Sequence, residues 1–425
     1  MIHAGSVLTL DVEKPAAGGR MLARHQGQVV LVWGAIPGER VKARVDRATK
    51  SIAFASTIEV LSASPDRRAV SGDARCGGNV LAHVGYERQR ALKGEIISDA
   101  FRRIGRVPLD RDPEVMASPE RGYRMRARLH AVNGRLGFYR EESHELCDAI
   151  ETGQLLESTN AWIAAAQERL RATSPGGVAA VEIAENIAGD ERACHLELRE
   201  GAHPSAYASL ANGLVGLTAQ PADWFEAETL AGTPSVTDVI QLRDGDADLH
   251  LRLTRNVRAF FQGNRFLVAS LLRQVMTMVT DEGPVVDLYA GGGLFGLGLL
   301  ARGMEDVTLV EGDPVSGADL QANVDPYRPR VRVERSSVET FLATRRSLRP
   351  TTVIVDPPRT GLSRDAVAGI IAMTPARLVY VSCDVATLAR DARALIDGGY
   401  TLGSMTALDL FPNTAHVETV AAFTR

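Results

Sequence analysis

The spacing of apolar residues divides the chain into three stretches with different periodicities. In the first, residues 5–62, short apolar and β-branched runs alternate with polar residues, and turn residues such as Gly18-Gly19 and Pro37-Gly38 separate them. Several short strands at such spacing predict a small five-stranded β-barrel of the kind that binds oligonucleotides. A β-domain without nucleic-acid binding fits the pattern equally well.

The second stretch mixes helical and strand periodicity. Two alternating runs within it are joined by Asn133-Gly134, a dipeptide typical of a tight hairpin turn. The elements expected are a helix over 85–104, a hairpin over 122–140, a helix over 153–173 and strands over 178–258. On the first helix, helical period places one apolar face on Leu92, Ile96, Ile97, Ala100 and Ile104.

From about residue 259, strands and helices alternate strictly. Such alternation predicts a parallel sheet covered by helices on both faces, and ligands of these sheets bind beyond the carboxyl ends of the strands. The residues that follow successive predicted strands, and should therefore share that edge, are Tyr289, Glu311, Asp356 and Cys383.

The three stretches predict an α/β protein with three domains. They are a barrel over residues 1–65, a mixed and strand-rich central domain over 66–250, and a Rossmann-like domain over 251–425. The helix over 85–105 could pack with the third domain.

Composition narrows the class of protein. With 45% hydrophobic and 24% charged residues, the chain is typical of a globular protein and unlike a disordered or collagen-like one. No apolar run approaches the roughly 20 residues of a membrane span, and the N-terminus lacks the pattern of a signal peptide. The four cysteines, none closely paired in sequence, predict a protein of the reducing cytoplasm.

The charge is unevenly distributed. The whole chain carries −4, whereas residues 1–65 hold eight basic and five acidic residues, a net +3. Arg124, Arg126 and Arg128 alternate along a predicted strand. A basic barrel and such a strand could contact phosphates, although a merely solvated strand face fits as well.

The glycine-rich segment 290–296 lies between a predicted strand and helix. Glycines there let the backbone turn sharply and approach a ligand, and Glu311 at the end of the next strand can accept hydrogen bonds from ribose hydroxyls. The pattern is shared by nicotinamide and S-adenosylmethionine enzymes, and it is closer to a methyltransferase loop. A structural turn with a solvated glutamate is the alternative.

Cys383 follows a strand and precedes a helix, where the helix dipole favours the thiolate. A buried structural cysteine is an equally good interpretation of this position. The Asp356-Pro357-Pro358 turn follows the preceding strand, and Glu418 lies between the last two strands. A thiol and a carboxylate on one sheet edge suggest a nucleophile and a general base.

Six segments, in order, carry a family resemblance. FFQGNRF, DLYAGGGLFG, LVEG, VDPPRTGL, YVSC with ATLARD, and FPNTAHVE resemble the RNA (uracil-5-)-methyltransferases. The barrel resembles the TRAM domain that many of them carry, and CGGNVLAHVGYERQRALK resembles their CGGCxxQHxxYxxQLxxK segment. The likeness spans nearly the whole chain.

The resemblance implies a fold, an activity and a site. The fold is a class I methyltransferase domain, and the activity is S-adenosylmethionine-dependent methylation of uridine C5 through a covalent bond between the cysteine and C6. By position in the motifs, Cys383 matches the nucleophile and Glu418 the base. The positions that match the family's S-adenosylmethionine-binding residues are Gln262, Tyr289, Glu311 and Asp356.

The chain departs from the family around a metal site. Many members bind an iron–sulfur cluster through four cysteines, but here only Cys76 and Cys147 match such places, and Asn79 replaces a third. Two thiolates cannot supply the four that such a cluster uses. We therefore expect no cluster and no other metal, and we expect packing to hold this region. Asp384 beside the nucleophile could raise the pKa of the thiol or cap the following helix.

Three functions remain open on the sequence. The first is an RNA uracil-C5 methyltransferase acting on structured rRNA or tRNA as a cytoplasmic monomer. The second is a methyltransferase of another base atom in which Cys383 is structural. The third is a catalytically weakened RNA-binding or RNA-folding protein, against which the presence of both Cys383 and Glu418 counts.

Overall fold

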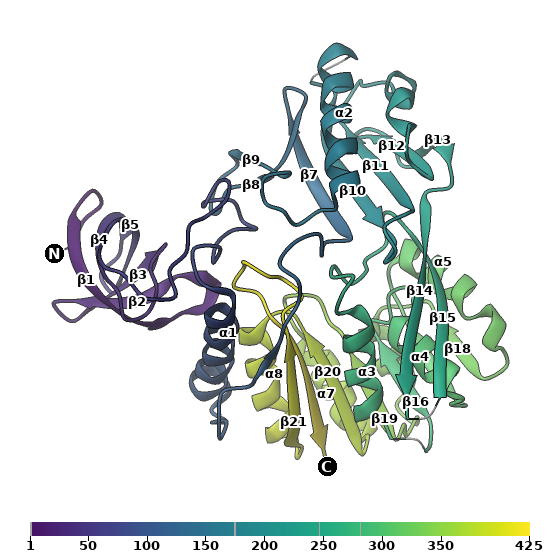
Figure 1. The fold of residues 1–425 in the computed structure, drawn as a ribbon. Coiled ribbons are helices and arrows are strands. Elements are labelled where there is room, and N and C mark those ends of the chain that lie inside the picture. The colour runs from purple at the N-terminus through teal and green to yellow at the C-terminus, as the bar shows by residue number, and fades with distance from the viewer. Residues whose placement is uncertain (1, 174–175, 246, 281) are drawn as a thin grey trace.

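The computed structural model describes residues 2–173, 176–245, 247–280 and 282–425. Figure 1 shows a small barrel on one side, a central sheet with one long helix above, and a larger sheet with flanking helices below. The barrel and the central sheet are each built from one continuous segment of the sequence, whereas the larger sheet also includes β6 (Val115–Met116), which precedes the central sheet.

The N-terminal strands form a closed barrel in the order β1-β2-β3-β5-β4. Alternate residues of β1 point inward, where Leu10 and Val12 join the barrel core. The alternation therefore identified the barrel correctly. Its strands are β1 (Val7–Pro15), β2 (Met21–His25), β3 (Gln28–Trp33), β4 (Arg40–Ala48) and β5 (Ile52–Ser62), with a 3₁₀ turn at η1 (Ala17–Gly19).

The central sheet has the order β13-β12-β11-β10-β7-β8-β9. One of its faces packs on helix α2, and Leu129, Ile163 and Leu196 belong to the shared core. The hairpin turn occurs at Asn133 and Gly134, both with positive φ, as that dipeptide predicts. The elements are β7 (Arg126–Val132), β8 (Arg135–Tyr139), β9 (Leu146–Asp148), α2 (Glu157–Thr173), β10 (Val178–Glu185), β11 (Arg192–Leu198), η3 (Pro204–Ala211), β12 (Gly216–Pro221) and β13 (Glu228–Gly232).

A long antiparallel hairpin, β14 (Ser235–Asp244) and β15 (Ala247–Asn256), connects the central sheet to the larger one. It packs over the helices of the larger sheet, and Ile240 and Leu251 join the core there. The boundary expected between residues 250 and 251 falls within β15.

The larger sheet has the order β18-β17-β16-β19-β20-β22-β21-β6. Its first five strands are parallel, whereas β22 runs antiparallel between β20 and β21. The strands are β6 (Val115–Met116), β16 (Val285–Leu288), β17 (Val307–Val310), β18 (Val331–Glu334), β19 (Thr352–Val355), β20 (Arg377–Ser382), β21 (Thr401–Leu408) and β22 (Glu418–Thr424).

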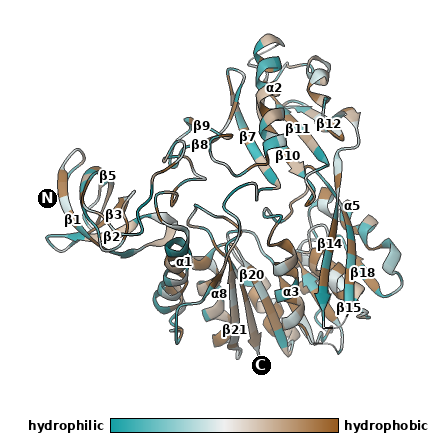
Figure 2. Ribbon diagram, viewed as in Figure 1, coloured by the Kyte–Doolittle hydropathy of each residue, from teal (hydrophilic) through white to brown (hydrophobic). Residues whose placement is uncertain are grey.

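Helices cover both faces of this sheet, as strict alternation predicts. Two separate hydrophobic clusters result, one against α3 and α4 and the other against α7 and α8. Figure 2 shows β20 and β21 between these helices as a predominantly hydrophobic region. The helices are α3 (Val268–Met278), α4 (Leu294–Arg302), α5 (Pro314–Asn323), η4 (Asp325–Tyr327), α6 (Val338–Thr344), α7 (Arg364–Met373) and α8 (Val385–Asp397).

Helix α1 (Tyr86–Ala100) precedes the central sheet in sequence but packs on the larger sheet. Ile97 and Phe101 lie in the same core as Leu388 of α8, while Leu92 lies in the barrel core. The expected apolar face is correct except at Ile104, which is 44% exposed. The backbone changes to a π-helical turn at η2 (Phe101–Gly105), and this rotates later residues off the face.

Among the described residues, no helix is long and apolar enough to cross a membrane.

Candidate active site at the carboxyl edge of the parallel strands

Four of the predicted site residues lie at one edge of the larger sheet. Tyr289 follows β16, Glu311 follows β17, Asp356 follows β19 and Cys383 follows β20. Because these strands are parallel neighbours, their carboxyl ends meet at one edge. The alternation in the sequence therefore predicted the common location correctly.

The glycine loop turns sharply between β16 and α4. Gly291 and Gly293 have φ of +56° and +98°, values that residues with a Cβ rarely adopt. Glu311 supports this turn, since one carboxylate oxygen accepts a hydrogen bond from the Gly291 N–H at 2.7 Å and the other accepts from the Asp313 N–H at 2.6 Å. The glutamate is thus held at the loop with lone pairs remaining for a ligand.

Asp287 is a site residue that sequence reasoning missed. Asp287 lies in β16 and is fully buried. Burial, followed by the nearby Asp356 and Glu311 carboxylates, raises the pKa of Asp287 well above its ordinary value. Its Oδ2 accepts from the Gly296 N–H at 3.1 Å, but Oδ1 has no hydrogen-bond partner within the described residues. An orphaned buried carboxylate oxygen indicates a missing donor. Its place at the start of the glycine motif was the available clue.

Gln262 reaches this edge from a distant part of the sequence. Its Nε2 donates to Asp356 Oδ2 at 3.0 Å across 94 residues. Burial raises the pKa of Asp356 to about 7, and the amide opposes that shift. Two neighbours fix the segment: Asn264 donates to the Leu410 carbonyl at 3.2 Å, and Arg265 donates to Glu185 at 2.7 Å.

These side chains fit S-adenosylmethionine. The carboxylates of Asp287, Glu311 and Asp356 are acceptors around a glycine turn, and the cofactor carries a sulfonium, an ammonium and ribose hydroxyls to match them. Tyr289, half-buried and with φ of +62°, completes the edge. The chain's own residues therefore offer a complementary set of acceptors.

Cys383 and Glu418 come together through strand register. Ser382 of β20 pairs with Thr419 of β22 in an antiparallel ladder, so the next positions along the two strands, Cys383 and Glu418, are adjacent. Glu418 is the first residue of β22 and is 2% exposed. Two residues 35 positions apart in the sequence thus lie side by side only because the last strand runs antiparallel.

The electrostatics of this pair differ from the sequence-based expectation. Burial, followed by the Glu418 carboxylate, raises the pKa of the Cys383 thiol to about 12, so the helix dipole does not produce a thiolate in the free protein. Burial, and then Asp356, raises the pKa of Glu418 well above its usual value. Arg359, which sequence reasoning did not single out, acts in the opposite direction on both groups.

Asp384 caps the helix after the cysteine. Its Oδ1 accepts a hydrogen bond from the Thr387 N–H at 2.8 Å, an N-cap geometry at the start of α8. Of the two roles considered for this aspartate, the structure therefore shows the cap.

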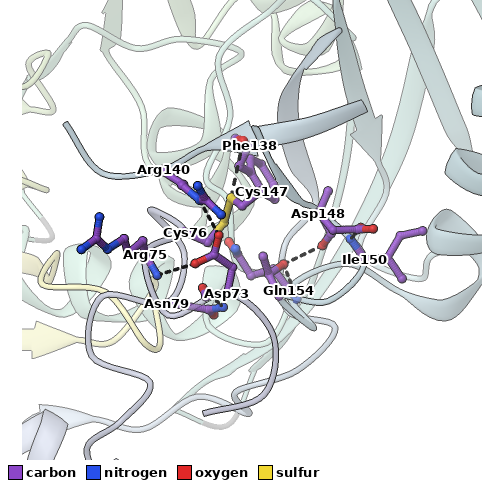
Figure 3. The surroundings of a disulfide bond; sticks show 12 residues. Asp73, Arg75, Cys76, Asn79, Phe138, Arg140, Cys147, Asp148, Ile150 and Gln154 are labelled. Carbon is purple, nitrogen blue, oxygen red and sulfur yellow. Dashed lines mark hydrogen bonds and ion pairs between the residues drawn. A yellow bond between two sulfur atoms is a disulfide. The ribbon is translucent and has the colours of Figure 1, made fainter. Parts of the chain in front are cut away.

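The remaining cysteines of the family's metal region form a disulfide. Cys76 and Cys147 are bonded across 71 residues, with a Cα–Cα distance of 5.6 Å (Figure 3). Beside them, Arg140 pairs with Asp73 at 2.6 Å, and the Asn79 side chain donates to the Asp73 carbonyl at 3.1 Å. The expectation that packing alone holds this region was wrong, because a covalent link contributes.

Within the ranges that the structure covers, no group of three or more His, Cys, Asp and Glu side chains is arranged to hold a metal ion.

Comparisons with known proteins agree in both halves of the chain. Residues 3–58 match the family model of the TRAM domain, and residues 233–425 match that of tRNA (Uracil-5-)-methyltransferase. The 23S rRNA (uracil(1939)-C(5))-methyltransferase of Pseudomonas putida is 31% identical, over 99% of this chain and 94% of that protein. The enzyme of the same name from Halomonas elongata is 30% identical, over 97% and 88%.

A solved structure has the same overall fold. The Pyrococcus abyssi tRNA (uracil-54, C5)-methyltransferase in complex with S-adenosyl-L-homocysteine matches with a TM-score of 0.74 and 24% identity, over 98% of this chain and 99% of that one. At this identity the match speaks for the fold, which thus includes barrel, central sheet and larger sheet in one arrangement.

Proposed function

Because this chain belongs to the RNA uracil-C5-methyltransferase family, we propose that Cys383 and Glu418 are the nucleophile and the base of its reaction, the S-adenosylmethionine-dependent methylation of uracil C5 in RNA. The observation that carries the proposal is the register of β20 and β22, which sets this thiol beside this carboxylate at the edge where the cofactor acceptors gather. Methylation of uracil C5 needs both groups, a nucleophile that adds to C6 and a base that removes the C5 proton.

Uracil C5 is a poor nucleophile until C6 is attacked. The Cys383 sulfur forms a bond to C6, and the ring electrons move to an enolate that makes C5 nucleophilic. S-adenosylmethionine supplies the electrophilic methyl group. Glu418 then takes the proton from C5, the ring double bond re-forms, and the Cys383 sulfur leaves as a thiolate. The covalent route divides one difficult substitution into easier steps.

The raised pKa values fit these roles. A carboxylate whose pKa is raised by burial is a stronger base than an exposed glutamate and can hold the C5 proton. The Cys383 thiol must lose its proton before attack, and Arg359 is the nearby cation that favours the thiolate. Gln262, Tyr289, Glu311 and Asp356 are proposed to hold the cofactor; all four lie at or beside the same edge.

Two variants test the proposed pair because they must fail differently. Cys383→Ala cannot attack C6, so it should transfer no methyl group and form no RNA adduct. Glu418→Gln keeps the nucleophile, so it should methylate once and then stall with RNA attached through Cys383. A denaturing gel with methyl-labelled cofactor shows the adduct as a shifted, labelled band.

The control is Cys194→Ala, which removes the other free cysteine, buried in β11. It should behave as the unaltered protein, which RNA containing 5-fluorouridine should trap because fluorine cannot leave as a proton does. Methylation by Cys383→Ala would show that the thiol is structural and that another base atom is methylated. The lack of any adduct in both unaltered protein and Glu418→Gln, with RNA still bound, would favour an RNA-binding role.

The substrate is proposed to be a uridine in structured rRNA or tRNA. The matched relatives act on 23S rRNA by name, and the similar solved structure is a tRNA enzyme. Mass spectrometry of nucleosides from separated rRNA and tRNA of a deletion strain decides between them, since 5-methyluridine should disappear from one fraction. We further propose a monomer, because every proposed catalytic residue comes from a single chain; light scattering measures its mass. A cytoplasmic location is proposed because rRNA and tRNA, the proposed substrates, are found there.

A further inference from the structure

The loop between β21 and β22 delivers the proposed base to the reactive edge. The loop comprises residues Asp409 to Val417, and Glu418, the first residue of β22, follows it directly. In Figure 1 this yellow loop rises above the sheet beside helix α1. The two segments are far apart in the sequence: Gln89 of α1 and Asn413 of the loop are separated by 324 positions. What holds such a loop decides where the carboxylate of Glu418 points.

Gln89 of α1 forms a two-point contact with the centre of the loop. Its Oε1 accepts from the Asn413 N–H at 3.0 Å, and its Nε2 donates to Asn413 Oδ1 at 2.9 Å. Gln89 is fully buried, and Asn413 is 9% exposed with φ of +64°. A side-chain amide that pairs with both backbone and side chain of one residue fixes its position and orientation.

Lys93, one helical turn further along α1, anchors the start of the same loop. Its Nζ donates to Asp409 Oδ1 at 2.5 Å and to the Phe411 carbonyl at 3.0 Å. Both charged groups have no exposed surface, and Asp409 Oδ1 also accepts from the Phe411 N–H at 3.2 Å. A buried pair is weak evidence for net stability, but it specifies geometry strongly, because either partner alone would be an uncompensated buried charge.

The outer side of Asn413 is occupied as well. Its carbonyl accepts from the Leu81 N–H at 2.8 Å, and its Oδ1 accepts a second hydrogen bond from Arg68 at 2.8 Å. Both residues belong to the segment that joins the barrel to α1. Residues 68–93, which lie outside the larger sheet in sequence, therefore supply several of the contacts that hold this loop, and Asn264 supplies another at the Leu410 carbonyl.

We infer that Gln89, supported by the buried Lys93–Asp409 pair, is a positioning residue for the base: it holds the 409–417 loop so that Glu418 can reach the C5 proton. The inference rests on the roles proposed above for Cys383 and Glu418. Proton transfer needs the base within hydrogen-bond reach, so a small displacement slows that step strongly. Attack by Cys383, which follows a different strand, needs no proton transfer to Glu418.

The separation of the two steps provides the test. Gln89→Met keeps the bulk of the side chain but loses both hydrogen bonds to Asn413 and the one that Nε2 donates to the Val84 carbonyl. Turnover on uridine RNA should fall about tenfold or more, because base catalysis contributes at least that much. The methylated covalent adduct should accumulate. Trapping by 5-fluorouridine RNA, which needs no proton removal, should proceed at the rate of the unaltered protein.

A second variant acts from the other side of the contact. Asn413→Gly removes the partner oxygen while keeping a backbone at positive φ that glycine adopts readily, so it should fold and show the same pattern. The matched control is Arg88→Met, which breaks the ion pair with Glu95 on the same helix away from the loop and should turn over normally.

Three results are informative about the inference. Accumulation of adduct with normal trapping in both variants supports it. Normal turnover without adduct in Asn413→Gly overturns it, as does a proportional loss of trapping and turnover in that variant, since a merely structural role predicts the latter. Failure of the unaltered protein to be trapped by 5-fluorouridine RNA would instead contradict the proposed function.

Discussion

At the scale of single residues, burial is the largest cause of the raised pKa values of Cys383 and Glu418. The sequence position of Cys383 favoured a thiolate, yet its thiol is surrounded by low-dielectric protein and two carboxylates, and its pKa rises to about 12. Arg359 is the counteracting charge. The free protein therefore holds a protonated thiol at neutral pH.

This sets the pH dependence of the reaction. For a thiol with a raised pKa, the thiolate fraction grows about tenfold per pH unit below that pKa, so kcat/KM should rise from about pH 7 to pH 9. Removing the guanidinium in Arg359→Met should raise the thiol pKa further and shift the whole profile to higher pH. Initial rates with saturating cofactor measure this.

The control for that profile is Arg364→Met, at the exposed start of α7, which should leave the curve in place. A flat profile over this range in the unaltered protein would mean that thiol deprotonation does not limit the reaction.

Glu311 holds the glycine loop through the Gly291 N–H and is also proposed to contact the ribose of the cofactor. Glu311→Ala loses the acceptor for the Gly291 N–H and the proposed ribose contact, so cofactor affinity should fall by roughly 1.5–3 kcal/mol. Calorimetry with S-adenosylmethionine measures the loss, with the exposed Glu305→Ala at the opposite end of β17 as control. Equal affinity of Glu311→Ala and the unaltered protein would show that the site is misplaced.

At the scale of elements, the disulfide and the pairing of β22 bring together segments that no local sequence pattern connects. The disulfide joins the segment before α1 to β9, and the isolated bridge between Cys76 and Arg140 connects the same segment to the residue that follows β8. The antiparallel insertion of β22 between β20 and β21 places Glu418, the proposed base, beside Cys383, the proposed nucleophile. Both are long-range pairings that no window of sequence contains.

The disulfide should contribute to stability in a redox-dependent way. Closing a 71-residue separation restricts the unfolded chain, so reduction should lower the free energy of unfolding by roughly 2–4 kcal/mol. Thermal unfolding with and without dithiothreitol measures the difference in protein prepared without reductant. The double variant Cys76→Ser/Cys147→Ser should unfold at the lower temperature and be insensitive to reductant; sensitivity that persists in it would place the effect elsewhere.

At the scale of the whole molecule, the barrel is built into the rest of the chain. Its buried Glu39 pairs with Arg67 at 2.6 Å, and its core includes Leu81 and Leu92 of the following segment. A deletion of residues 1–65 would expose these side chains, so charge variants are the cleaner test of RNA binding. Of the strand arginines, Arg126 and Arg128 pair with glutamates, which leaves the barrel as the better source of phosphate contacts.

Two exposed cations of the barrel, Arg44 and Lys50, form no ion pair within the described residues. The variant Arg44→Ala/Lys50→Ala should weaken RNA binding and reduce its salt dependence by about one unit of slope per lost phosphate contact. Filter binding over a salt series measures both, and cofactor affinity should not change. Lys42→Ala on the same strand, paired with Glu59 at 2.8 Å, is the control. An unchanged slope would assign RNA binding to another surface.

Local patterns of apolar, polar and turn residues determined much of the fold of this protein. Alternation along residues 5–62 predicted the barrel, and Asn133-Gly134 predicted a hairpin. Strict alternation of strands and helices after residue 259 predicted the parallel sheet and the edge where Cys383 lies. These features depend on contacts between residues close in sequence, or on the fixed direction of parallel strands. They can therefore be predicted from one amino-acid sequence.

Only the tertiary structure decided which distant groups meet. Four features depend on what surrounds a residue in space. They are the Cys76–Cys147 disulfide, the hydrogen bonds between Gln89 and Asn413, the Asp287 oxygen without a hydrogen-bond partner among the described residues, and the raised pKa of Cys383. Desolvation and pairing across hundreds of residues leave no periodicity in the sequence, because they arise from the packing of elements whose order in space differs from their order in the chain.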